Sequence, residues 1–250
     1  ARAGVGVDNI DVAAATKRRI PVVNAPAAST ISVAELTMAH MLALARHVPR
    51  AHMSLKAGKW EKKRFEGTEL HGKTLGLVGS GRIGAEVVKR AKAFGMRAIA
   101  YDPYLPPKVA EERGIRLLPT LDAVLREADF VSIHAALTNE TRHMIGAPQL
   151  AAMKKSAYLV NCARGEIVDE AALAAALKEG RIAGAALDVF EKEPPAGSPV
   201  LAADNTSFTP HLGASTKEAQ ERVGDTVAED VLRVLAGQKP EFSVNPDALR

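Results

Sequence analysis

The sequence predicts an α/β fold with a doubly wound, mainly parallel sheet. Short β-rich runs alternate with longer helical patterns along the 250 residues. One apolar run leads into a glycine-rich turn that opens a helix, and several later runs end in polar or charged residues. The length allows one large domain, or one domain with part of another.

The composition excludes several classes of protein. Hydrophobic residues make up 47% and charged residues 25%, which is ordinary for a globular protein. No apolar stretch has the roughly 20 residues of a membrane-spanning helix, and no signal peptide opens the chain. The only cysteine, Cys162, excludes an internal disulfide and suits a reducing compartment, so we expect a cytoplasmic protein. The charge of +4 suits a small anionic ligand, and no basic stripe indicates nucleic acid.

The first third of the chain predicts one long helix and an arm. An apolar run at 20–23 precedes a helix from Thr30 to Ala45, and Pro49 lies beyond its end. The stretch 57–71 has no clear period and is expected to be an extended arm. The apolar residues of the helix that are available for burial are Ile31, Leu36, Met38, Met41 and Leu42.

Regular elements then alternate up to a final helix. The predicted strands are 74–78, 97–101, 130–133, 157–160, 183–187 and 206–209. The predicted helices are 82–94, 121–126, 147–153 and 169–178, with Asp169 as the N-cap of the last. A final helix from about Ser215 to Leu235 would carry a capping box formed by Ser215 and Glu218. Because the chain opens at Ala1 without an initiator Met, we interpret it as a fragment.

The glycine-rich turn has the pattern G-x-G-x-x-G, with glycines at Gly79, Gly81 and Gly84. Alone the pattern is weak, but here it follows a strand, opens a helix and precedes an acidic residue at the end of the next strand, Asp102. The three glycines would make the turn, admit a pyrophosphate and let the helix pack closely. Helix N-terminal N–H groups would bind the pyrophosphate. The alternative is an ordinary strand–turn–helix.

Asp102 indicates which dinucleotide would bind. Its carboxylate can accept hydrogen bonds from ribose hydroxyls and would repel a 2′-phosphate, so NAD is expected rather than NADP. The predicted unit is therefore a Rossmann domain that binds NAD. We predict no metal site.

Three later segments place a polar group where a strand ends. They contain Arg164, the pair Asp188 and Glu193, and His211. Ligands of open α/β sheets bind at the carboxyl ends of strands, so these segments are expected to share one crevice. Arginine binds a carboxylate with a planar fork, and histidine exchanges protons near neutral pH. Taken singly, each could instead be an ordinary surface or structural residue, and His134 also ends a strand.

The same segments resemble the D-isomer-specific 2-hydroxyacid dehydrogenases. The similarity runs over nearly the whole chain in one register. It is carried by Arg2 to Asp11, Gly58-Lys59-Trp60, Gly79 to Gly84, Tyr101-Asp102-Pro103, Val160 to Asp169, Ala185 to Pro195 and Pro210 to Gln220.

The resemblance implies roles for the catalytic residues. Arg164 would bind the substrate carboxylate and polarise the carbonyl oxygen, His211 would be the general acid and base, and Glu193 would orient His211. Asp188 would hold the nicotinamide carboxamide. The residues implied in cofactor binding are Gly79, Gly81, Arg82, Ile83, Gly84, Asp102, Ala135, Cys162, Arg164, Asp188, His211, Gly213 and Ala214.

The resemblance also implies a domain plan and a substrate side. The NAD-binding domain would span 26–214, while 1–25 and 215–250 would be remnants of a smaller flavodoxin-like substrate domain, whose N-terminal part is absent. Arg2 and Gly4 resemble the substrate-side loop. Lys62, Lys63 and Arg64 lie in an arm used for dimer contacts, so a homodimer or homotetramer is expected, and one of these cations would reach the substrate phosphate of the partner's site.

The implied reaction is oxidation of D-3-phosphoglycerate to 3-phosphohydroxypyruvate with NAD, the entry step of serine synthesis. One alternative is another D-2-hydroxyacid dehydrogenase that reduces glyoxylate or hydroxypyruvate. A second alternative, from another class, is an NADH-sensing binding protein similar to the C-terminal-binding-protein corepressors.

Overall fold

The computed structural model describes residues 1–249, so Arg250, the last residue of the expected 215–250 piece, lies outside the described residues. The chain divides into two compact units. One combines the first 33 residues with the segment that begins at Leu212, and the other spans Ala34–His211. These boundaries lie within eight residues of those drawn from the sequence, and the assignment of the units to cofactor and substrate stays a prediction.

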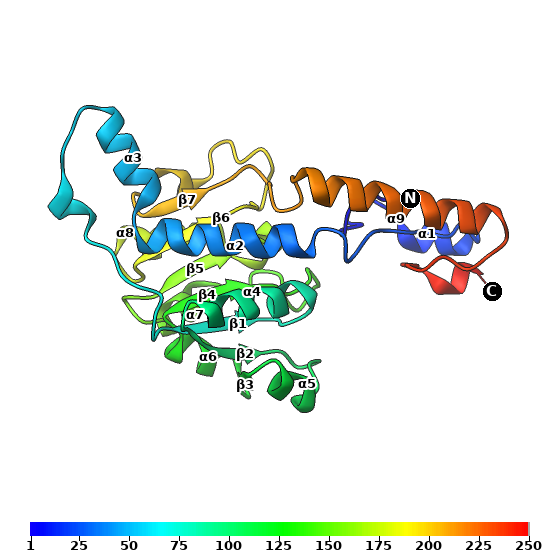
Figure 1. Cartoon of the computed structure of the whole chain (residues 1–250), viewed down its shortest axis with the longest axis horizontal. Coiled ribbons are helices and arrows are strands. Elements are labelled where there is room, and N and C mark those ends of the chain that lie inside the picture. The colour runs from blue at the N-terminus through cyan, green and yellow to red at the C-terminus, as the bar shows by residue number, and fades with distance from the viewer. Residues whose placement is uncertain (250) are drawn as a thin grey trace. The chain divides into compact units, whose positions relative to one another are not determined.

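The larger unit contains a seven-stranded, fully parallel sheet in the order β3-β2-β1-β4-β5-β6-β7 (Figure 1). The order reverses between β1 and β4, which is the switch point of a doubly wound sheet. The predicted parallel α/β fold is therefore confirmed. The strands are β1 (Thr74–Val78), β2 (Arg97–Tyr101), β3 (Ile115–Leu117), β4 (Phe130–Ile133), β5 (Tyr158–Asn161), β6 (Gly184–Leu187) and β7 (Thr206–Phe208).

Helices cover both faces of the sheet. A side chain at Gly76 would meet Val124 of α6, whereas the third glycine of the turn, on α4, packs against Leu77. Neighbouring strand residues point to opposite faces, so α4 and α6 lie on opposite sides of β1. The helices are α2 (Thr30–Ala45), α3 (Val48–Lys56), α4 (Arg82–Ala93), α5 (Pro107–Glu112), α6 (Leu121–Glu127), α7 (Ala147–Ala152) and α8 (Glu170–Lys178), with short 3₁₀ turns at η1 (Lys62–Phe65), η2 (Gly165–Ile167) and η3 (Pro199–Ala202).

Burial on both faces explains why the central strands were visible in the sequence. Every residue of β1, β4, β5 and β6 is buried, as expected for strands covered on both sides. β3 was missed because it is a three-residue edge strand with one buried residue, Ile115. Two short helices of this unit, α3 and α5, were also missed. Each has a proline in its first turn, where proline is well tolerated, and the prediction placed Pro49 of α3 beyond a helix end.

The expected burial of helix α2 is confirmed in part, because Met38 and Met41 are buried and Leu36 and Leu42 are half-buried. Ile31 is 39% exposed, whereas Ser32, Thr37 and His40 are buried. Apolar residues occur all round this helix, so its pattern could not select one face. One of these buried polar side chains, His40, lies 3.0 Å from the hydroxyl of Ser207 in β7.

The smaller unit contains α1 (Val12–Lys17), α9 (Lys217–Leu235) and the 3₁₀ turn η4 (Pro246–Leu249). Ala25, Ala28 and Val223 form its core cluster. The predicted Ser215 capping box is wrong, because Thr216 is the N-cap of α9 and accepts a hydrogen bond from the N–H of Ala219. Among residues 1–249, no helix has the length and apolar character needed to span a membrane.

Candidate active site at the carboxyl edge of the sheet

The glycine-rich turn joins β1 to α4. Gly79 has φ +81°, a conformation that favours glycine, and a Cβ there would lie 2.9 Å from the backbone nitrogen of Ala135. A Cβ on the buried Gly84 would lie 3.2 Å from the Gly79 carbonyl oxygen, so this glycine lets the helix pack closely. A Cβ on Gly81, by contrast, would meet nothing within 4 Å.

The start of α4 can therefore receive an anion. Gly81 is the N-cap residue and supplies no side-chain cap, and the first helical residues are Arg82 and Ile83. N–H groups in the first turn of a helix have no partner within the helix and carry a positive partial charge. Open space over Gly81, beside uncapped N–H groups, fits the pyrophosphate of a dinucleotide.

Asp102 directly follows β2 and faces this turn. Its carboxylate accepts hydrogen bonds from the N–H of Ser80, at 2.7 Å, and from the N–H of Tyr104, at 2.9 Å. Arg113 donates to the carbonyl oxygen of Ser80 at 2.7 Å and holds the turn from another side. The structure thus places Asp102 beside the glycine turn, where the sequence analysis expected the adenosine ribose to bind.

Strand register brings the later segments together. Asn161 of β5 pairs with Leu187 of β6, which pairs with Phe208 of β7. The residues that follow these three therefore emerge along one edge of the sheet: Cys162, Asp188 and Thr209. The backbone N–H of Asp188 donates to the Asn161 carbonyl oxygen at 2.9 Å, which continues the pairing past the strand ends.

Hydrogen bonds from the side chain of Asn161 hold the turn that carries Arg164. The buried Asn161 side chain donates to the carbonyl oxygen of Arg164 at 2.9 Å and accepts from the N–H of Ala163 at 3.0 Å. Arg164 itself donates to the Ala163 carbonyl oxygen at 2.7 Å. The next residue, Gly165, lies against the backbone of Phe190, so the Arg164 turn and the loop after β6 are in direct contact.

Glu193 and His211 form a hydrogen-bonded pair. Nδ1 of His211 lies 2.7 Å from Oε2 of Glu193, and the two side chains are 52% and 39% exposed. The other carboxylate oxygen, Oε1, accepts the N–H of Phe190 at 3.2 Å. A carboxylate at Nδ1 favours the tautomer with a proton on that nitrogen and stabilises the imidazolium.

The backbone at His211 has φ +56°, in the left-handed region that few residues other than glycine adopt. Its N–H donates to the carbonyl oxygens of Asp188, at 2.8 Å, and Thr209, at 3.1 Å. These bonds fix the direction in which the imidazole leaves the chain, next to the loop that carries Glu193.

That loop is anchored to the start of α8 by reciprocal hydrogen bonds. The buried Glu170 accepts the N–H of Glu191 at 2.6 Å, and Glu191 accepts the N–H of Glu170 at 2.9 Å. Glu170 also accepts a hydrogen bond from the hydroxyl of Ser198. His143 lies 3.2 Å from the Glu191 carboxylate. The anchoring limits the positions that Glu193 can occupy.

The rival histidine, His134, lies at the end of β4 but has no carboxylate partner among the described residues. Its Nε2 is 2.9 Å from the hydroxyl of Ser132, and burial lowers its pKa to about 4. A ring with so low a pKa is a weak base and is poorly suited to take up a substrate proton near pH 7. Burial also raises the pKa of Cys162 to about 12, so its thiol is not a nucleophile.

The remaining predicted residues are spread over both units. Gly213 and Ala214 belong to the smaller unit, where their carbonyl oxygens accept from Ser32, at 2.6 Å, and Gln220, at 2.9 Å. Arg2 donates to the Gly6 carbonyl oxygen at 3.2 Å, and Gly4 has φ +152°; both lie in the smaller unit. The structure therefore brings together Arg164, Asp188, Glu193 and His211 within the larger unit.

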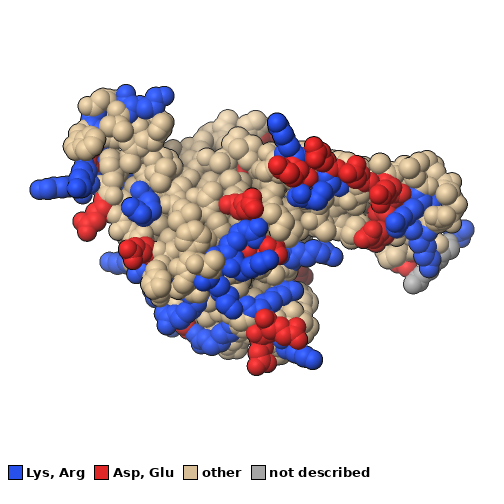
Figure 2. All heavy atoms as spheres, viewed as in Figure 1, with Lys and Arg blue, Asp and Glu red and all other residues tan. Residues whose placement is uncertain are grey.

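The three predicted cations of the arm form η1. Lys62 and Lys63 are exposed, and Arg64 lies 3.4 Å from Glu61 and 5.9 Å from the centre of the Phe65 ring. Figure 2 shows Lys and Arg side chains gathered over α3 and the segment that follows it. This basic surface belongs to the larger unit, and its predicted role at a partner's site stays a prediction.

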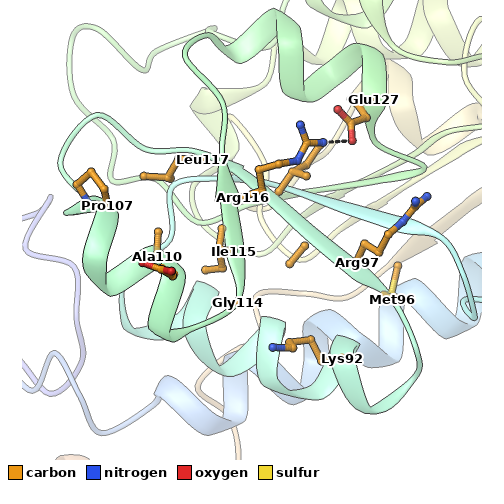
Figure 3. A pocket seen from close by; sticks show the side chains of 13 residues that line it. Lys92, Met96, Arg97, Pro107, Ala110, Gly114, Ile115, Arg116, Leu117 and Glu127 are labelled. Carbon is orange, nitrogen blue, oxygen red and sulfur yellow. Dashed lines mark hydrogen bonds and ion pairs between the residues drawn. The ribbon is translucent and has the colours of Figure 1, made fainter.

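A cavity of about 680 Å³ lies elsewhere, at the β3 edge of the sheet. Figure 3 shows Lys92, Arg97 and the ion-paired Arg116 and Glu127 around it. It contains none of the predicted site residues. Within residues 1–249, no group of three or more His, Cys, Asp or Glu side chains could hold a metal ion.

The sequence did not identify the residues whose hydrogen bonds and packing hold the site residues in place. Asn161 was visible only as the residue that follows the predicted strand 157–160, and Gly165 only as part of a matched segment. Glu170 follows the predicted N-cap of α8 and would ordinarily be a solvated first-turn carboxylate. The buried His40 has one detectable signal, a polar residue within the otherwise apolar stretch of α2.

Comparisons with known proteins show the family to which the chain belongs. Residues 38–213 match the family model described as D-isomer specific 2-hydroxyacid dehydrogenase, NAD binding domain. The chain is 60% identical over 244 residues to a D-3-phosphoglycerate dehydrogenase of Methanocaldococcus jannaschii, a match that covers 98% of this chain and 47% of the relative. The chain spans about half the length of the curated relatives it matches.

Solved structures of related enzymes have the same fold. A glyoxylate reductase from Paecilomyes thermophila is 36% identical with a TM-score of 0.90, over 96% of this chain and 73% of the other. A D-lactate dehydrogenase from Aquifex aeolicus, complexed with NAD and lactic acid, is 33% identical with a TM-score of 0.88, over 97% and 78%. The sheet is thus a Rossmann fold, and the chain belongs to the D-isomer specific 2-hydroxyacid dehydrogenase family, with the family's NAD-binding domain at residues 38–213.

Proposed function

We propose that the protein oxidises D-3-phosphoglycerate to 3-phosphohydroxypyruvate with NAD, the entry step of serine synthesis. The observation that carries the chemistry is the 2.7 Å pair of Glu193 and His211, on a loop in contact with the Arg164 turn. The 60% identity to a D-3-phosphoglycerate dehydrogenase supports this substrate over others.

The cofactor would lie along the carboxyl edge of the sheet. The N-terminus of α4, with Gly81 before it, would bind the pyrophosphate, and Asp102 would accept from the adenosine ribose. Ala135 and Cys162 would line the cleft with backbone, and Asp188 would hold the nicotinamide carboxamide. Bound NAD supplies the acceptor for a hydride from C2 of the substrate.

The side chains would handle the charge and the proton. The Arg164 guanidinium would pair with the substrate carboxylate and polarise the C2 oxygen as the C–H bond breaks. Nε2 of His211 would take the hydroxyl proton, because Nδ1 already bonds to Glu193. Glu193 stabilises the imidazolium that results, so proton removal becomes easier while the hydride leaves.

The domain plan and the assembly follow the same proposal. The larger unit would be the NAD-binding domain, and the smaller unit, which holds Arg2 and Gly4, would belong to the substrate domain. The basic arm with Lys62, Lys63 and Arg64 would form contacts in a homodimer or homotetramer, in the cytoplasm. An acidic substrate matches the positive charge of the chain.

A glyoxylate or hydroxypyruvate reductase is the second candidate, supported by the 36% identity to a glyoxylate reductase. The two functions share the Arg–Glu–His set and differ in how they treat the substrate phosphate. Rates with D-3-phosphoglycerate and 3-phosphohydroxypyruvate should exceed those with glycerate, hydroxypyruvate and glyoxylate. A preference for the unphosphorylated compounds would favour the second candidate.

The central experiment replaces His211 by Ala and measures hydride transfer and NAD binding separately. We expect transfer to be lost while the NAD dissociation constant changes little, because the imidazole moves a proton and the cofactor is held by other groups. His52→Ala, at an exposed histidine on α3, is the matched control and should keep wild-type turnover. Loss of NAD binding together with transfer would indicate a structural histidine.

A further inference from the structure

Four polar side chains next to the candidate nicotinamide site form a continuous series of hydrogen bonds, here called the polar chain. Ser207 Oγ lies 3.0 Å from Nδ1 of His40, and Nε2 of His40 lies 2.9 Å from Oγ1 of Thr209. Thr209 in turn donates to Oδ1 of Asp188 at 2.5 Å. His40 is 2% exposed, Ser207 8% and Asp188 1%, and Thr209 between His40 and Asp188 is half-buried. Three elements contribute to the chain: α2, β7 with the residue after it, and the end of β6.

The proton positions in this chain depend on one another. A carboxylate can only accept hydrogen bonds, so Thr209 must donate its single hydroxyl proton to Asp188. Nε2 of His40 must then donate to Thr209, which requires the tautomer with a proton on Nε2. In the neutral ring Nδ1 is left as an acceptor, and it receives the hydroxyl proton of Ser207.

The surroundings of His40 support a neutral ring. Burial lowers the pKa of His40, and the charge of Asp188 opposes this effect only in part. The other tautomer would make Nε2 an acceptor that competes with Asp188 for the Thr209 proton. Only one tautomer therefore satisfies all four side chains.

We propose that His40, acting through Thr209, is a positioning residue that fixes the Asp188 carboxylate toward the nicotinamide end of the cofactor site. The proposal rests on the proposed function, in which Asp188 holds the nicotinamide carboxamide. A fixed Oδ1 also fixes the plane of the carboxylate, so the carboxamide meets an acceptor that is already oriented. Hydrogen bonds to a charged group are strong, so losing this one loosens the orientation of the carboxylate.

The test compares NAD with ADP-ribose, which lacks the nicotinamide, by calorimetric titration of the whole chain. Thr209→Val removes the hydroxyl with little change of volume, and His40→Leu removes the donor to Thr209. Each should weaken NAD about 10-fold, equivalent to about 1.4 kcal/mol, and ADP-ribose by less than about 2-fold. Thr209→Ser and His40→Gln keep a donor in place and should restore most of the NAD affinity.

Two further measurements separate positioning from plain stability. Met41→Ala makes a cavity at a fully buried position of α2 and removes none of the four hydrogen-bonded side chains, so it should lower the melting temperature and leave the ratio of the two affinities unchanged. Nitrogen-15 spectra of the wild-type protein should show His40 protonated at Nε2 and bare at Nδ1. The opposite tautomer would overturn the proposal.

The outcomes also separate the positioning role of His40 from the proposed cofactor site. A wild-type chain that binds neither nucleotide refutes the proposed cofactor site, whatever the state of His40. A wild-type chain that binds both, with Thr209→Val and His40→Leu leaving the ratio of affinities unchanged, refutes the positioning role and leaves the proposed function standing.

Discussion

Gly165 offers a sharp test of the contact between the Arg164 turn and the Glu193 loop. A Cβ built on Gly165 would lie 1.9 Å from the carbonyl carbon and 2.0 Å from the carbonyl oxygen of Phe190. These are backbone atoms, so no side chain can rotate away. Gly165 does not have a positive φ, so the clash is purely one of space.

The size of the clash sets the expected effect of Gly165→Ala. Ordinary contacts begin at 3.4 Å, so the two segments must separate by about 1.5 Å. A misplacement of about 1 Å can cost roughly 100-fold in rate, so we expect kcat/KM to fall at least that far. Overpacking of this kind costs about 1–3 kcal/mol of stability, which leaves a domain with 5–15 kcal/mol folded.

The assay is NADH formation measured alongside thermal unfolding. Gly146→Ala is the matched control in the same unit, because its Cβ would meet its nearest atom at an ordinary 3.6 Å, and it should keep wild-type kinetics. Normal kcat/KM in Gly165→Ala would refute the reasoning that close contact between the two segments sets the catalytic geometry.

Three further predictions concern the cofactor, the substrate and pH. Asp102→Ala should relax the preference for NAD over NADP, and an unchanged ratio of kcat/KM values would remove its assigned role. Arg164→Lys should lower kcat/KM severely, since lysine lacks the two-pronged fork; near-normal rates would contradict carboxylate binding. The pKa of His134 is lowered from 6.5 to about 4, so only the unfolded state takes up a proton between these values, and the free energy of unfolding should fall by up to about 3 kcal/mol from pH 7 to pH 4. Urea titrations over this range should show a flatter profile for His134→Gln, and identical slopes would count against the burial of this ring.

The sequence predicted the interior of the sheet better than its edge. The bounds of β1, β2, β4 and α2 are as expected, because each of these elements buries enough apolar surface to leave a pattern in the sequence. The edge strand β3 and the short helix α5 carry too little buried surface to leave such a pattern. The N-cap of α9 is Thr216, one residue after the predicted Ser215. Serine and threonine are both good N-caps, so the sequence alone does not select between them.

The site was predictable in part. Strand-end position identified Arg164, Asp188 and His211 as neighbours, since parallel strands share a carboxyl edge. The Glu193–His211 distance depends on how a long loop folds, and no local pattern encodes it. The contribution of His40 could not be predicted either, because its partners Ser207 and Thr209 lie more than 160 residues away in the chain.

The left-handed backbone at His211 has a consequence for engineering. A residue with a Cβ in this conformation costs roughly 1–2 kcal/mol relative to glycine, so a library screened only for heat resistance would enrich glycine at position 211. If His211 acts as proposed, the variants recovered from such a screen would be more stable but inactive. Selection for thermal stability therefore favours glycine at position 211, whereas selection for turnover favours histidine. Sequencing this one position would show whether an evolved variant has kept the residue proposed for catalysis.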